Sequence, residues 1–243
     1  MLVTWVAGLV DTLGFLMLSE ILTGNMTGNS VRVAIASTDT DWNTAAHRLW
    51  PLLIFVAGLV ISACIHEIGV RRAIAQTSAI VFLLEAGLFS GFIALFPAHH
   101  FVSFRLFSPY FYPGVALLSL GMGLQNATVT RVGALSVRTT HVTGTMTEFA
   151  EGISQFIFWA WDRQQRGREI FPLAKKIKSF RETVLMAGLW AAFFTGGVCA
   201  ALAGKRWGAL ALVPAIAALL LLSGIDMVRP IAASQEHPPQ ENH

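Results

Sequence analysis

The sequence predicts an all-α membrane protein, a bundle of about six transmembrane helices in two related halves. Hydrophobic residues make up 54% of its 243 residues and charged residues 13%, well below the roughly 25% charged residues of soluble domains. Several apolar stretches approach the roughly 20 residues that cross a bilayer. A polar segment with glycine also occurs once in each half. Matching breaks of this kind are typical of a site built from both halves.

The first half, about residues 2–97, alternates apolar and polar stretches. We expect an apolar helix at 2–18, a polar break at 23–29, a short apolar piece at 31–37, a loop at 38–48, and apolar helices at 50–70 and 74–96. The short helix from Asn25 has only about 13 residues, roughly 20 Å, against a hydrocarbon core of about 30 Å. We therefore interpret it as a half-helix or re-entrant element.

The second half, about residues 109–228, repeats this order. It has an apolar stretch at 112–125, a polar one at 131–141, a mixed one at 142–161, a basic loop at 162–181, and apolar helices at 183–204 and 207–225. Residues 232–243 are rich in Pro, Gln, Glu and His, and we expect them to be disordered. We treat residues 1–231 as a single transmembrane domain.

The halves correspond through two motifs. Residues 8–11 (GLVD) match residues 123–126 (GLQN), which pairs Asp11 with Asn126. The break TGNMTGN at 23–29 matches THVTGTMT at 140–147, which pairs the following residues: Asn25 with His141, Thr27 with Thr143, Gly28 with Gly144, and Asn29 with Thr145. Three spans in each half would invert the second half relative to the first, a design of many transporters.

Positive charge favours this six-span arrangement with both termini in the cytoplasm. Most Lys and Arg residues then lie in inner loops, as the positive-inside rule requires: Arg71, Arg72, Arg131, Arg138, the basic residues of 163–181, and Arg229. An eight-span arrangement with parallel halves separates the charges less well and places Arg32 inside a span. Whether six or eight segments cross the membrane stays open at this point.

Asp11 is the candidate functional residue with the strongest sequence signal. It lies in an apolar helix, and a carboxylate at bilayer depth costs about 2.5 to 3.5 kcal/mol. It could bind a proton, a cation or a substrate donor, or it could only bond to the break. His141 could titrate near neutral pH and pair with it. Glu85 also lies within an apolar stretch but has no counterpart in the second half, so we rank it below Asp11.

The two breaks supply the other candidate groups. Helices that begin inside a membrane direct unpaired N–H groups and a positive dipole end into the protein. The alternative is that they are capped helices that only pack closely at glycine. The predicted substrate or ion site contains eight residues: Asp11, Asn25, Thr27, Asn29, Gln125, Asn126, His141 and Thr143.

Other function classes find little support. No hydrolase, metalloprotease, P-loop or dinucleotide motif occurs in a suitable context, so we expect no enzyme, no cofactor and no metal. The basic residues fit membrane topology and not nucleic acid. Cys64 and Cys199 lie in apolar segments, where we expect buried, unbridged thiols. His66 and Glu67, one turn before Arg71, fit an interfacial charge cluster.

The motifs at 7–11, 23–29, 123–127 and 137–144 resemble the YoaK family, also called domain of unknown function 1275, over roughly residues 5–226. The resemblance implies about six transmembrane helices in a bacterial inner membrane, in a family described only as permease-like. The short N-terminus and His141 depart from the family pattern. We expect a small-solute permease or secondary transporter, with lipid, an unidentified solute, protons and a second copy as candidate partners. The alternative is a non-transport scaffold, assembly or lipid-interacting protein.

Overall fold

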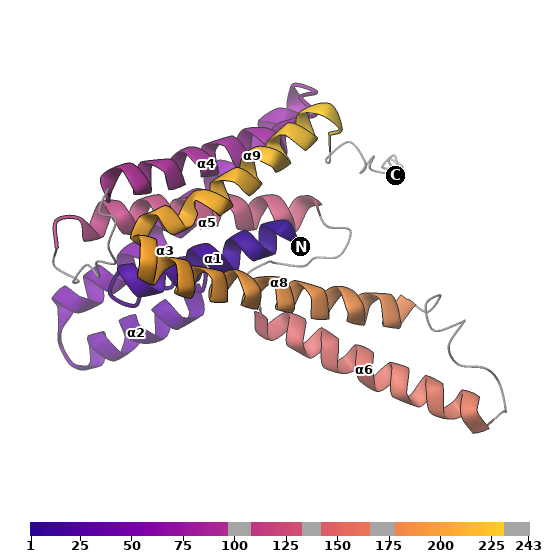
Figure 1. Cartoon of the computed structure of the whole chain (residues 1–243). Coiled ribbons are helices and arrows are strands. Elements are labelled where there is room, and N and C mark those ends of the chain that lie inside the picture. The colour runs from indigo at the N-terminus through magenta and orange to yellow at the C-terminus, as the bar shows by residue number, and fades with distance from the viewer. Residues whose placement is uncertain (97–107, 133–141, 166–177, 231–243) are drawn as a thin grey trace, which may run out of the picture.

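The computed structural model describes residues 1–96, 108–132, 142–165 and 178–230. These residues are helical apart from turns (Figure 1). Their elements are α1 (Leu2–Met17), α2 (Met26–Thr38), α3 (Trp42–Arg71), α4 (Thr77–Leu95), α5 (Phe111–Val132), α6 (Val142–Gln165), α8 (Lys178–Trp207), the 3-10 helix η1 (Gly208–Leu212) and α9 (Val213–Val228). The predicted tail at 232–243 and the central part of the basic loop lie outside the described residues.

Within the described residues, three helical stretches are long and apolar enough to cross a membrane: Trp42–Arg71, Thr77–Leu95 and Arg181–Val228, while α1 is a shorter apolar helix. Large apolar side chains also point away from the bundle, as on α3, where Leu53, Val56 and Val60 are each more than half exposed. An apolar surface of this extent suits lipid and not water. The prediction of an all-helical membrane bundle is confirmed.

The short helix after the break has the predicted length, but α3 begins earlier than expected. Residues 42–48, predicted as loop, form the first two turns of α3. Asp41 caps this end by accepting a hydrogen bond from the Thr44 N–H over 3.1 Å, which satisfies a donor that the helix leaves free. Pro51 lies inside α3, as it does in the predicted helix at 50–70.

Two further differences concern the second half and the thiols. The apolar stretch 207–225 does not start as a span: η1 first turns the chain at Gly208, whose φ of 56° suits glycine, and α9 follows. Cys64 and Cys199 are exposed on the outside of the bundle and not buried. Thiols are apolar enough to face lipid.

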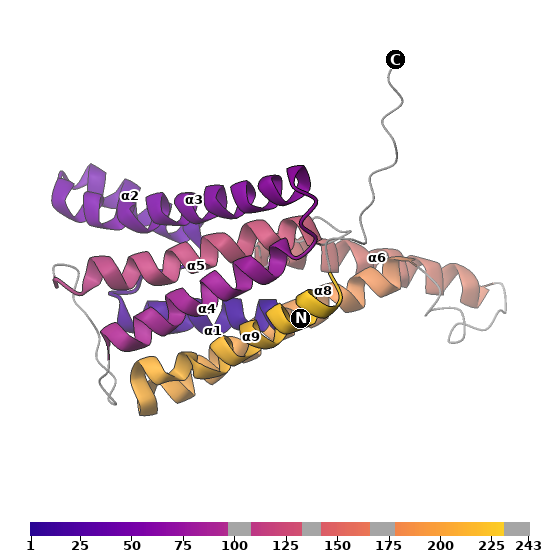
Figure 2. The ribbon, with the colours of Figure 1, turned by 90° about the horizontal axis from the view of Figure 1, so that it is seen from above.

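The helices pack in a connected pattern (Figures 1 and 2). α1 lies along α8, α3 lies along α5, and α4 lies between α5 and α9. α2 packs on α3 at one end of the bundle, and α6 packs on α8 and extends beyond the other end. The core is apolar and holds large buried side chains such as Phe89, Phe92, Phe111 and Met122.

Glycine lets two of these helix pairs approach closely. A Cβ on Gly58 of α3 would lie 2.4 Å from the Leu120 carbonyl oxygen, and one on Gly123 of α5 would lie 2.3 Å from the Phe55 carbonyl oxygen. Gly8 of α1 and Gly196 of α8 meet in the same manner. Small residues at such crossings are a common means of helix association in membranes.

Candidate functional site

The break between α1 and α2 folds back onto Asp11. Asp11 Oδ1 accepts hydrogen bonds from the Gly24 N–H over 2.8 Å and from the Thr23 hydroxyl over 3.3 Å. Asp11 and Thr23 are buried. A Cβ on Gly14 would lie 2.5 Å from Thr23 Cγ2, so glycine there makes room for the threonine. The carboxylate therefore fixes the start of the break against α1.

Asn29 holds the same loop from the α2 side. Its Nδ2 donates to the Leu22 carbonyl over 2.6 Å, and its Oδ1 accepts from the Leu22 N–H over 3.3 Å. Asn25 caps α2 by accepting from the Gly28 N–H, as its position in the motif predicts. Thr27 is exposed on α2. These contacts explain most of the TGNMTGN motif as loop and helix-start chemistry.

The second-half candidates lie elsewhere. Gln125 of α5 is buried and bonds to Glu85 of α4, and Asn126 beside it is also buried. Thr143 lies in the first turn of α6, and His141 lies outside the described residues. The hydrogen bonds thus unite Asp11 and Asn29 with the first break, and Gln125 with Glu85. A single site that joins all eight predicted residues stays a prediction.

The pair Glu85–Gln125 is a fully buried polar contact between α4 and α5. Gln125 Nε2 donates to Glu85 Oε1 over 2.8 Å, and both side chains have no exposed surface. Glu85 Oε2 and Gln125 Oε1 have no hydrogen-bond donor among the described residues. Buried polar atoms are nearly always paired in native proteins, so such an exception calls for a physical explanation.

A second polar network joins α3, α4 and α5. His66 Nδ1 lies 2.9 Å from the Thr77 hydroxyl, and His66 Nε2 lies 3.3 Å from the Thr128 hydroxyl. Ser62 is 3.0 Å from the same Thr128 oxygen. Of the charge cluster expected at His66, Glu67 and Arg71, Glu67 pairs with Arg71 over 2.8 Å. His66 instead belongs to the polar network. The missed signal was the spacing of Ser62 and His66, one turn apart in an apolar stretch.

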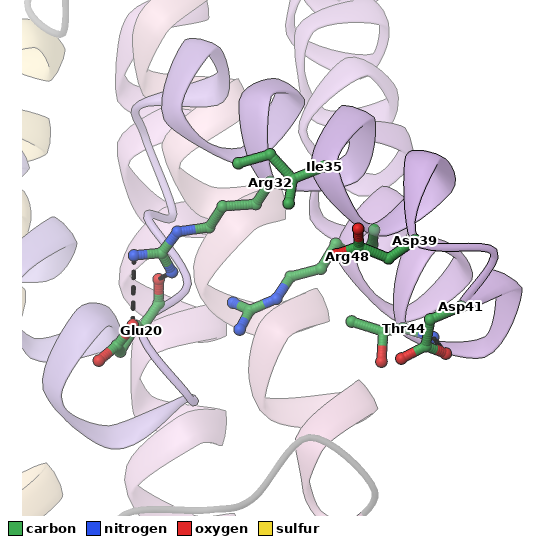
Figure 3. A pocket seen from close by; sticks show the side chains of 8 residues that line it. Glu20, Arg32, Ile35, Asp39, Asp41, Thr44 and Arg48 are labelled. Carbon is green, nitrogen blue, oxygen red and sulfur yellow. Dashed lines mark hydrogen bonds and ion pairs between the residues drawn. The ribbon is translucent and has the colours of Figure 1, made fainter.

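An open cavity of about 310 Å³ lies at the end of the bundle where α2 meets α3 (Figure 3). Arg32 pairs with Glu20 over 3.3 Å, and Arg48 donates to the Ser19 carbonyl over 2.8 Å. Charges of both signs line the space, so it is suited to polar or zwitterionic groups. Its lining residues are Glu20, Arg32, Ile35, Ala36, Asp39, Asp41, Thr44 and Arg48.

None of the eight predicted site residues lines this cavity. Ser19 and Glu20 have positive φ values of 49° and 60°, a backbone form that is uncommon outside glycine. The bonds from Arg48 and Arg32 to this turn help to hold it. Within the described part of the chain, no three His, Cys, Asp or Glu side chains come together to hold a metal.

Comparison with known proteins agrees with this architecture. A family model described as "Protein of unknown function (DUF1275)" matches residues 1–225. The chain is 30% identical over 205 residues to the UPF0700 transmembrane protein YoaK of Bacillus subtilis (strain 168), which covers 81% of this chain and 79% of that relative. No solved structure matches this chain. The chain therefore belongs to the DUF1275 family and is a transmembrane protein.

Proposed function

We propose that this protein is a small-solute permease, a secondary transporter of the bacterial inner membrane with both termini in the cytoplasm. Its polar site would lie between two halves that have opposite orientations in the bilayer. The proposal includes no catalytic step, no cofactor and no nucleic-acid partner. Transporters built from inverted repeats bind their substrates near the bilayer midplane, where the two repeats meet.

The observation that carries the proposal is the direction of the helices. Gly188 of α8 lies against Met1, just before α1, and Gly204 further along α8 lies against Leu13 near the end of α1, so these two helices run parallel. α3 and α5 also run parallel, since Gly58 meets Gly123 and Ser62 meets Thr128 further along.

The contact between α1 and α5 supports an inverted arrangement of the two halves. Leu18, which follows α1, lies against Gly114 near the start of α5, so these equivalent helices run in opposite directions. Because α8 runs parallel to α1 and α3 runs parallel to α5, α3 and α8 also run in opposite directions. α4 runs antiparallel to α5, since Glu85 meets Gln125 and Phe96 meets Gly114. The chain turns at η1 between α8 and α9, which sets α9 opposite to α4.

The alternative function is a non-transport membrane scaffold that binds lipid or assembles with other proteins. It is favoured by the closed bonding of Asp11 to its own loop and by the tight glycine crossings. A scaffold needs a dry and rigid junction between the halves. A permease needs a junction that water and solute reach from both sides in turn.

Accessibility of Asn126 separates these two functions. We would introduce Asn126→Cys into protein carrying Cys64→Ala and Cys199→Ala, and react it with a small membrane-impermeant thiol reagent in right-side-out and inside-out vesicles. A permease predicts reaction from both sides. Protection from both sides supports the scaffold and contradicts the permease.

Two control positions calibrate the labelling. Asp39→Cys, in the exposed turn after α2, should react from one side only. Gly87→Cys, on an exposed face of α4 with open space around it, should stay unreactive because lipid surrounds it. Reaction of Gly87→Cys would mean that the reagent had entered the bilayer.

A further inference from the structure

Glu85 and Gln125 form a polar contact within a largely apolar interface between α4 and α5. Buried apolar residues one turn away on their helices include Phe82, Phe89 and Met122, and the buried Thr128 lies one turn after Gln125. Among the described residues, the ion pairs are Arg32 with Glu20 and Arg71 with Glu67. No described cation therefore neutralises Glu85. An isolated ionised carboxylate in such surroundings is so costly that it tends to take up a proton instead.

The Glu85–Gln125 pair has more hydrogen-bond acceptors than donors. An ionised carboxylate offers only acceptors, and the Gln125 amide adds one more acceptor and donates to Glu85 Oε1. Two oxygens, Glu85 Oε2 and Gln125 Oε1, are left without a donor among the described residues. A single proton on Glu85 Oε2 supplies a donor and removes the charge.

A row of polar side chains leads from this pair toward the turn between α3 and α4. Thr128 lies one turn after Gln125 on α5 and 3.3 Å from His66 Nε2. His66 Nδ1 in turn lies 2.9 Å from the Thr77 hydroxyl at the first residue of α4. Hydroxyls and imidazole can both donate and accept protons. The row therefore places exchangeable groups between Glu85 and the end of the bundle, with one helical turn separating Thr128 from Gln125.

Other titratable groups on the helices around α4 lie away from Glu85. His66 of α3 bonds to Thr77, about 12 Å along the helix from Glu85, and Asp226 of α9 accepts from the Ala79 N–H, about 9 Å along it. Tyr112 of α5 bonds to His47 of α3. Both residues lie near the starts of their helices, whereas Thr128 lies near the end of α5. η1 contains no titratable side chain.

We propose that Glu85 and Gln125 form a proton-binding site, in which Glu85 Oε2 carries a proton that Gln125 Oε1 accepts as a hydrogen bond. When the site discharges, the O–H bond at Glu85 breaks, the proton passes to water at the α3–α4 turn, and the Gln125 N–H stabilises the carboxylate that remains. The role of this proton as the coupling ion rests on the proposed permease function. The site itself does not.

Infrared spectroscopy of the purified protein in liposomes tests the site without any substrate. A protonated carboxyl gives a carbonyl stretch separate from the amide bands. We expect this band at neutral pH in the unmodified protein, its shift in D₂O, and its loss in Glu85→Gln. Gln125→Leu should move the band to higher frequency, because the carbonyl loses the N–H that bonds to it. A contact in which Glu85 stays ionised predicts no such band.

Two variants serve as matched controls. Asp11→Asn and Asp226→Asn remove the other buried carboxyls among the described residues and should leave the band in place. Glu85→Gln should fold, because the new amide can still pair with Gln125, and thermal unfolding checks this. A missing band in the unmodified protein, or a band that survives Glu85→Gln, would overturn the proposal.

The test also separates the site from the transport function. If Asn126→Cys proves inaccessible while the band depends on Glu85, the permease fails and the proton site stands. If Asn126→Cys reacts from both sides while the band is absent, transport stands and the proton site fails.

Discussion

Gly8 of α1 and Gly196 of α8 each lie against the backbone of the other helix. A Cβ on Gly8 would lie 2.0 Å from the Phe193 carbonyl oxygen, and a Cβ on Gly196 would lie 2.1 Å from the Trp5 carbonyl oxygen. No side-chain rotation relieves a contact with backbone. Gly8 and Gly123 correspond in the sequence repeat, and each lies where a helix of its own half crosses a helix of the other half.

Alanine at these positions should loosen the bundle. We expect Gly8→Ala and Gly123→Ala each to lower the free energy of unfolding by about 1 to 3 kcal/mol, the usual cost of overpacking. Thermal unfolding in detergent measures the change. The equal size of the two effects follows from the repeat, and a large cost at one site with none at the other would argue against it.

Two glycines provide the matched control for that series. A Cβ on Gly87 or Gly224 would meet nothing within 4 Å. Gly87→Ala and Gly224→Ala should therefore stabilise their helices, by up to about 1 kcal/mol through helix propensity. If all four alanine variants lost stability alike, close packing would not be the reason for the effect.

Asp11 should act as a hydrogen-bond acceptor and not through its charge. Asp11→Ala leaves the buried Gly24 N–H and Thr23 hydroxyl without their acceptor, at a cost of about 1 to 3 kcal/mol. Asp11→Asn keeps a carbonyl oxygen in place and should recover most of this stability. Hydrogen exchange at the Gly24 amide reports the bond directly. Equal exchange rates in the Asn and Ala variants would instead show that the negative charge matters.

The cap of α3 should depend on pH. Hydrogen bonds from the Thr44 hydroxyl and then from its N–H lower the pKa of Asp41 below its ordinary value. The cap therefore has its full effect above the pKa of an unfolded aspartate, and loses it as the pH falls through the lowered pKa of the folded state. Hydrogen exchange at Thr44 and Ala45 should speed up in that acidic range. Asp41→Asn should remove the pH dependence, and its persistence would point to another group.

The sequence predicted the helical membrane fold well, because length and apolar composition decide which segments cross a bilayer. It also placed the break and the short α2, whose cap at Asn25 is a local feature. It missed the start of α3, because Trp42 to Arg48 is polar. Asp41 followed by Thr44 is a helix-start signal that the polar composition of residues 38–48 had obscured.

The buried polar pair was harder to predict. Gln125 was selected through its place in the repeat, and Glu85 through its position within an apolar stretch outside the repeat, so nothing in the sequence joins the two residues. Their pairing depends on how α4 packs on α5. Conversely, Asp11 looked functional because it is a carboxylate in an apolar helix, and only the folded loop reveals its bonds to Thr23 and Gly24.

The orientation of the two halves is the central claim of this account, and labelling from each side of the membrane tests it directly. Asp39→Cys, after α2, and Asp162→Cys, near the end of α6, are exposed positions at opposite ends of the bundle. In protein lacking Cys64 and Cys199, an impermeant thiol reagent should reach Asp39→Cys only from the periplasm and Asp162→Cys only from the cytoplasm. Labelling of both positions from the same side would contradict the inverted arrangement.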